Sequence, residues 1–137
     1  IKVDDQPGRT VDLTGLFAMM QTETFGGGYR VAPGMQPFGD SASIVLGFGL
    51  TKLQMLRVMG PLEKGRHVGK WGKISMEPCR RFEIKALDSE GNPTEEKGHD
   101  PPLFISLDGE ISMTTPVSFE FHEGQLNVRG GQSPPNL

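Results

Sequence analysis

Two carboxylates, Asp108 and Glu110, flank Gly109 and are the side chains of this sequence best suited to chemistry. A carboxylate can accept the proton of a hydroxyl group, and carboxylate oxygens are ligands that Mg²⁺ prefers. Asp and Gly are also common in β-turns, where an exposed carboxylate needs no function. The pattern therefore leaves two interpretations open, a reactive site and an ordinary solvated turn.

The segments around this turn are expected to be β-strands. Alternation of apolar and polar side chains predicts strands over 103–108, 117–122 and 125–129, joined by turns at Asp108–Glu110 and Glu123–Gly124. The two carboxylates would then stand at the end of a strand, at the edge of a sheet.

Further strands are expected from apolar runs earlier in the chain. They cover 13–22, which should be buried on both faces, and 43–48. Two more are expected over 73–76 and 81–87, separated near Pro78. Residues 1–9 should be either a loose segment or half of a hairpin, and 88–102 an exposed loop.

One helix is predicted, over about residues 51–63. Thr51 suits the N-cap and Gln54 the N3 position of a capping box. Further along, apolar side chains recur at every third residue and form a stripe that we expect to pack on a sheet. The stripe consists of Leu53, Leu56 and Met59.

Length and composition agree with these elements. The 137 residues suffice for one domain over 1–137, and the 19 Gly and 11 Pro are typical of a turn-rich β-domain. We therefore predict a mainly-β fold, an antiparallel β-sandwich with one packed α-helix. A single cysteine, Cys79, excludes an internal disulfide framework. It fits an intracellular, reducing compartment and a buried, inert thiol. No apolar run is long enough to span a bilayer.

The net charge of −3 gives no electrostatic case for binding nucleic acid. Basic residues nonetheless gather locally, which suits phosphates, an anionic membrane surface or simply a solvated face. They are Lys64, Arg66, Lys70 and Lys73, and the pair Arg80–Arg81.

Short motifs follow one another along most of the chain, from about residue 13 to 128. They are FGGGYRVAP at 25–33, GLTKL at 49–53, KGRH at 64–67, LDGE at 107–110 and TPV at 115–117. In this order, with a helix between the second and the third, they resemble the carboxy-terminal lobe of the diacylglycerol kinase, sphingosine kinase and bacterial lipid kinase superfamily. Taken without the resemblance, the glycines at 26–28 indicate a bulge or tight crossover.

The resemblance implies a β-sandwich lobe that holds a lipid in a cleft against an amino-terminal nucleotide-binding lobe. The sequence contains no GGDGT-type motif of that second lobe. By resemblance, Asp108 would deprotonate or orient the lipid hydroxyl, and Glu110 would reach the magnesium–nucleotide side. His67 is either an ordinary polar residue of a loop or, together with Arg66, a residue of the lipid cleft.

The cofactors that the resemblance implies, ATP and Mg²⁺, belong to the intact enzyme, and we expect the isolated chain to be inactive. The implied partners are the amino-terminal lobe, in the same polypeptide or as a separate chain, and a lipid substrate, with peripheral membrane contact. The expected location is intracellular, at the periphery of a membrane or in an organelle. Because the chain begins at Ile1, we expect a fragment or a processed product. Many bacterial members also carry a structural metal site after the Ala-Pro loop, but only Asp40 of its acidic pattern is present, so we do not expect that site.

Two other functions remain open. The lobe could be a catalytically inactive structural or interaction subunit of a larger assembly, in which Asp108 and Glu110 would be dispensable. It could also be a free-standing lipid-binding β-sandwich, which would need an apolar cleft along 13–20.

Overall fold

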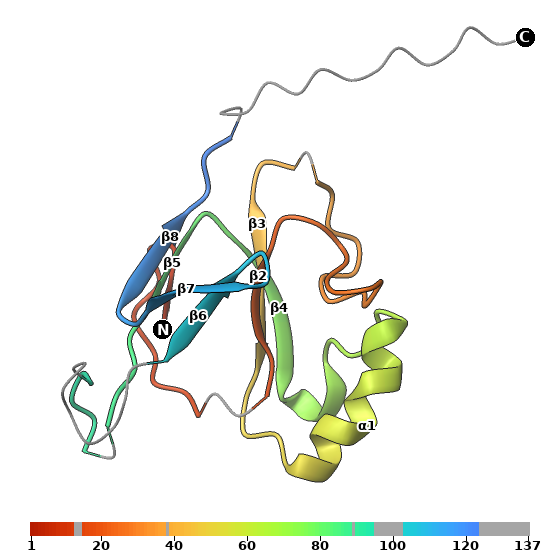
Figure 1. The fold of residues 1–137 in the computed structure, drawn as a ribbon, viewed down its shortest axis with the longest axis horizontal. Helices are drawn as coiled ribbons and strands as arrows, with labels where there is room; N and C mark the ends of the chain where they lie inside the picture. Colours follow the sequence, from red (N-terminus) through yellow and green to blue (C-terminus); the bar gives the residue numbers. More distant parts are fainter. Residues whose placement is uncertain (13–14, 38, 89, 95–102, 124–137) are drawn as a thin grey trace, which may run out of the picture.

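Two three-stranded antiparallel sheets form most of the computed structural model, which describes residues 1–12, 15–37, 39–88, 90–94 and 103–123 (Figure 1). The first sheet has the order β1-β5-β8, with β1 at Lys2–Val3, β5 at Arg81–Ile84 and β8 at Val117–Glu120. The second has the order β2-β3-β4, with β2 at Phe17–Met20, β3 at Ala42–Gly47 and β4 at Ile74–Cys79. The predicted mainly-β, antiparallel fold with one helix is confirmed.

The central strand β3 is buried along its whole length and separates two cores. Its alternate residues Ala42, Ile44 and Leu46 pack between the two sheets, where they meet Phe82 and Ile84 of β5. Val45 points to the opposite face, toward the helix α1 (Lys52–Glu63). Since successive side chains of a strand point to opposite faces, β3 contributes to both layers. Figure 1 shows the β2-β3-β4 sheet between α1 and the first sheet.

The helix begins as the sequence predicts. The Gln54 backbone N–H donates to the Thr51 hydroxyl oxygen at 3.2 Å, and the Thr51 N–H donates to the Gln54 side-chain oxygen at 3.0 Å. This reciprocal pair is a capping box, which satisfies backbone donors that have no partner within the helix.

The predicted packing face of α1 is wrong. The helix packs on the sheet through Val58 and Leu62, whereas the predicted stripe faces outward. The exposed fractions of its members are 54% for Leu53, 72% for Leu56 and 43% for Met59. Val58 and Leu62 are four residues apart and therefore share a face that the stripe does not. The helix thus has two apolar faces and only one sheet to cover.

Two strands differ from the prediction in extent and burial. β2 is shorter than the predicted 13–22, and because it lies at a sheet edge only Met20 is buried. β4 continues through Pro78 to Cys79, and the break falls at Arg80 instead. Pro lacks an N–H, which an edge strand such as β4 tolerates on its unpaired side.

A hairpin of β6 (Phe104–Leu107) and β7 (Glu110–Thr114) forms the third sheet. β7 was not among the predicted strands. The predicted strand over 125–129 lies outside the described residues, as does the part of the 88–102 loop from 95 to 102.

Cys79 ends β4 and is buried in the core between the sheets. Burial, followed by the negative charges of Asp4 and Glu77, raises the pKa of the Cys79 thiol to about 11. The predicted burial of the thiol is confirmed, and the raised pKa disfavours the thiolate, which is the reactive form. Within the described ranges, no helix has the length and hydrophobicity needed to cross a bilayer.

Candidate functional site

The two candidate carboxylates lie at the turn between β6 and β7, two positions apart in the chain. Leu107 pairs with Glu110, so the loop consists of Asp108 and Gly109 alone. Both have positive φ, 48° and 94°, as a type I′ turn requires. Asp-Gly is among the sequences that favour this turn, so hairpin geometry accounts for Asp108 and Gly109. The geometry of the hairpin does not require a glutamate at position 110, so it does not account for Glu110.

Both carboxylates are exposed, and neither forms a hydrogen bond or ion pair within the part of the chain that the structure describes. The hairpin that carries them is nevertheless held in place. Ile105 of β6 belongs to the core between the sheets and Met113 of β7 packs against it. A hairpin anchored in this way presents two free carboxylates to solvent.

Thr115 closes the base of the hairpin. Its hydroxyl oxygen accepts a hydrogen bond from the Leu103 N–H at 3.1 Å, and its own N–H donates to the Leu103 carbonyl at 3.0 Å. Thr115 is buried, which limits competition from water. The TPV motif at 115–117 therefore supports the turn of the LDGE motif.

The KGRH motif that follows α1 packs against the FGGGYRVAP segment. At Gly65, with φ of 65°, an added Cβ would lie 3.1 Å from Pro33 Cβ and 3.3 Å from Arg30 Cβ. Only glycine combines this backbone with so close an approach. The structure thus brings together two motifs that are about 30 residues apart in the sequence, a proximity that no local pattern reveals.

Glu23 holds the end of the FGGGYRVAP segment in place through hydrogen bonds. Its carboxylate accepts hydrogen bonds at 3.0 Å from the Gly34 N–H and from Arg30 Nε. These bonds, with the Gly34 N–H as the larger effect, hold the pKa of Glu23 below its usual range. Glu23 was not singled out from the sequence, because its partners lie seven and eleven residues away.

The three glycines of the segment lie in an exposed turn that a bridge between Phe25 and Tyr29 closes. All three have positive φ, so they have the structural role that the sequence indicates. No helix begins at the turn to complete a phosphate-binding loop of the usual kind.

His67 and Arg66 are placed very differently although they are adjacent. Arg66 is exposed, whereas His67 is fully buried. Neither ring nitrogen of His67 has a hydrogen-bond partner of good geometry among the described residues. Burial lowers the pKa of His67, while a backbone hydrogen bond at Val31, whose geometry is poor, acts in the opposite direction. Burial of an imidazole without a strong hydrogen bond is costly, above all for its charged form.

His67 should make stability depend on pH. Its folded-state pKa lies below the ordinary histidine value of 6.5, so the unfolded chain binds this proton more strongly. Its contribution to stability is therefore present above about pH 6.5 and is lost as the pH falls toward the folded-state pKa. We expect His67→Leu to flatten the decrease in unfolding free energy below that pH, as measured by urea denaturation. His122→Leu is the control, since His122 is exposed. Equal slopes for the two variants would contradict this role.

The described contacts do not bring the carboxylate turn and His67 together. The hairpin packs on the core between the sheets. His67 follows α1, and its neighbour Val31 belongs to the core on the helix side of the β2-β3-β4 sheet. The carboxylate turn and His67 are therefore two separate candidate sites in this structure.

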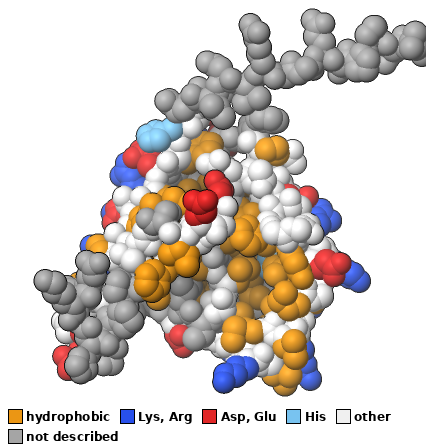
Figure 2. Space-filling view, viewed as in Figure 1, with side chains coloured by type: hydrophobic (Ala, Val, Ile, Leu, Met, Phe, Trp, Pro, Cys, Tyr) orange, Lys and Arg blue, Asp and Glu red, His pale blue; other side chains and the backbone are white. Residues whose placement is uncertain are grey.

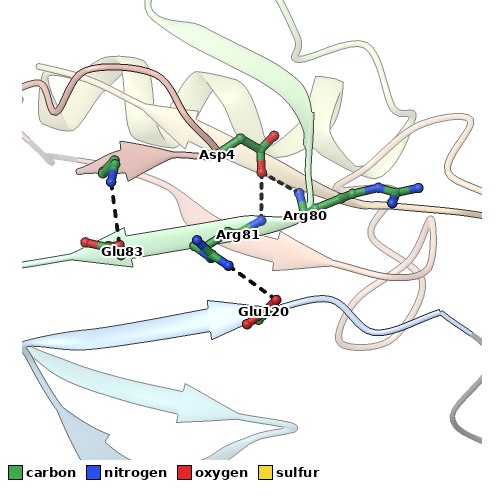
Figure 3. A network of polar contacts seen from close by, with 6 residues as sticks. Asp4, Arg80, Arg81, Glu83 and Glu120 are labelled. Atoms are coloured by element: carbon green, nitrogen blue, oxygen red, sulfur yellow. Dashed lines mark hydrogen bonds and ion pairs between the residues drawn. The ribbon is translucent and has the colours of Figure 1, made fainter.

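Figure 3 shows a polar network near the N-terminus. Its residues line a shallow surface depression. Asp4 Oδ1 accepts hydrogen bonds from the Arg80 N–H at 2.8 Å and the Arg81 N–H at 2.7 Å. The Arg81 guanidinium pairs with Glu120 at 3.4 Å across β5 and β8. Because these groups satisfy one another, the network joins β1 to the turn between β4 and β5 and is structural.

No three His, Cys, Asp or Glu side chains lie together as a metal site in the described ranges. Asp108 and Glu110 could provide only part of a Mg²⁺ coordination shell, which is common when substrate phosphates supply other ligands. Asp40 lies 3.8 Å from the Arg80 guanidinium, in an exposed pair.

Comparison with known proteins adds no relative: no family model, no curated protein and no solved structure matches this chain.

Proposed function

We propose that the chain is the carboxy-terminal lobe of an ATP-dependent lipid kinase of the diacylglycerol or sphingoid-base type. One observation carries the proposal: the β6–β7 turn presents two free carboxylates, Asp108 and Glu110, on a hairpin anchored in the core. The five motifs in family order and the β-rich fold with one helix support it.

The chemistry requires a base and a metal–nucleotide partner. A lipid hydroxyl is a weak nucleophile until a carboxylate takes its proton, which is the role of Asp108 in this proposal. Glu110, two residues along the chain, would contribute an oxygen ligand to Mg²⁺. When bound, Mg²⁺–ATP would supply the γ-phosphoryl group and leave as ADP, Mg²⁺ would offset the charge of the phosphates, and a second lobe would hold the nucleotide.

The hydroxyl end of the lipid would have to lie at the β6–β7 turn, within reach of Asp108. Arg66 and His67 lie elsewhere, after α1 on the helix side of the β2-β3-β4 sheet, so neither would meet the reacting hydroxyl. Arg66 is exposed there and can meet a phosphate or headgroup.

The test is lipid phosphorylation by the native polypeptide that contains this chain. Asp108→Asn and Glu110→Gln should each impair it, whereas Glu90→Gln, which alters an exposed carboxylate elsewhere, should not. If both site variants keep the unaltered rate, the assignment of these carboxylates is wrong.

The alternative is an inactive interaction subunit, which the exposed apolar face of α1 favours.

The activity of the isolated chain tests whether phosphorylation requires a second lobe. We expect no ATP-dependent lipid phosphorylation by the 137-residue chain, because it carries no recognisable nucleotide-binding loop. Measurable phosphorylation by the purified chain would contradict the need for a second lobe.

A further inference from the structure

Residues 50–73 concentrate the positive charge of this protein. The segment contains six of the 14 Lys and Arg residues but only one of the 17 Asp and Glu residues, Glu63. The remaining chain has eight basic and 16 acidic residues. A segment of net charge +5 therefore lies in a chain whose remainder is −8. The basic residues are Lys52, Arg57, Lys64, Arg66, Lys70 and Lys73.

The same segment exposes apolar side chains. Of the thirteen large hydrophobic residues that are exposed in the described part of the chain, six lie in these 24 positions. Leu56, at 72% exposed, protrudes most. The six are Leu53, Met55, Leu56 and Met59 on α1, and Val68 and Trp71 after it.

Basic and apolar groups occupy one continuous piece of structure. The Lys73 ammonium donates to the Gly49 carbonyl at 2.6 Å and to the Gln54 side-chain oxygen at 3.3 Å. This holds the short 3₁₀ turn η1 (Lys70–Gly72), which carries Trp71, beside the first turn of α1. Figure 2 shows hydrophobic side chains gathered over α1 with Lys and Arg side chains at their border.

We propose that residues 50–73 dock on the surface of an anionic lipid bilayer, with α1 lying in the interface. The exposed Leu and Met side chains would enter the boundary between headgroups and acyl chains. Trp71 suits the headgroup level, where tryptophan is enriched in membrane proteins. The basic side chains would meet lipid phosphates and carboxylates. This proposal is independent of the kinase assignment.

Charge distinguishes a membrane from a second copy of this chain. A two-fold dimer through the same face would bring two segments of charge +5 together, and like charges across an interface oppose association. An anionic bilayer instead supplies the complementary charge and accepts an apolar face without demanding a matching shape.

Trp71 provides the measurement, since it is the only tryptophan. The chain is titrated with vesicles of phosphatidylcholine alone and with vesicles that also contain phosphatidylserine. We expect a blue shift of the Trp71 emission and co-sedimentation with the anionic vesicles, both weakened by added salt. Absence of binding to the anionic vesicles would overturn the proposal, as would equal binding to both kinds.

Five variants, two of them controls, locate the surface. Leu56→Ser should weaken vesicle binding about tenfold, whereas Ile111→Ser, which changes a β7 residue that is also 72% exposed, should not. Lys64→Glu and Lys70→Glu should each weaken vesicle binding about fivefold or more. Lys85→Glu, which changes a basic residue outside the segment 50–73, should have little effect. All five positions are exposed, so thermal unfolding should remain unchanged.

Two results would contradict this assignment. Equal losses from Leu56→Ser and Ile111→Ser would show that the docking surface is not at α1. A stable dimer in sedimentation equilibrium that Leu56→Ser dissociates, without vesicle binding by the unaltered chain, would assign the apolar face to a second copy instead.

Discussion

Replacement of Asp108 by Asn in the native polypeptide is expected to slow lipid phosphorylation by about 10²–10⁴-fold, the usual contribution of a positioned general base. Asn cannot take the proton of the lipid hydroxyl. It does keep the hairpin, because Asn-Gly adopts the positive φ values of this turn as readily as Asp-Gly. A loss of rate therefore reports on the carboxylate and not on the turn.

The measurement is the initial rate of phosphate transfer from ATP to lipid at saturating ATP. Glu110→Gln should lower the rate and raise the Mg²⁺ concentration needed for half-maximal activity, since it removes one oxygen ligand. Glu90→Gln serves as the matched exposed carboxylate. Unaltered rates in both site variants, with unaltered thermal unfolding, would leave the turn as a structural feature and favour the interaction subunit.

Phe82→Ala is expected to reduce the free energy of unfolding by about 3–5 kcal/mol. Phe82 is fully buried between the two sheets, and its ring centroid lies 5.1 Å from that of Phe17. It occupies the central strand β5 of the first sheet, opposite Val3 on one side and Phe119 on the other. Its loss would open a cavity at the point where three strands and both sheets meet.

Urea denaturation of the isolated chain measures this effect. Phe104→Ala is the control, because Phe104 is 68% exposed and should change stability by less than about 1 kcal/mol. Single domains are stable by only about 5–15 kcal/mol, so Phe82→Ala should remove a large fraction of the stability of this chain. A change no larger than that of Phe104→Ala would mean that the two sheets do not share this core.

Local signals were sufficient for several elements. The capping box at Thr51 and Gln54 and the turn at Asp108–Gly109 depend on contacts within four residues, so their residue types predict them directly. The apolar run at 43–48 predicted a strand, which the structure has as β3, and its lack of polar alternation fits a strand that is covered on both faces. The two candidate carboxylates were visible for the same reason, as members of a short turn.

The sequence by itself determined the mainly-β composition, the single helix, the capped start of that helix and the exposed Asp-Gly turn. Only the tertiary structure decided which face of α1 is buried, because Val58–Leu62 and the stripe of Leu53, Leu56 and Met59 are both apolar and the choice depends on contacts with the distant β2-β3-β4 sheet. It likewise decided that His67 is buried, since the chain around it is polar and its neighbour Val31 lies 36 positions earlier. The carboxylate turn could therefore be predicted from the sequence. Its separation from His67 could not, because it depends on how the sheets and the helix pack on one another.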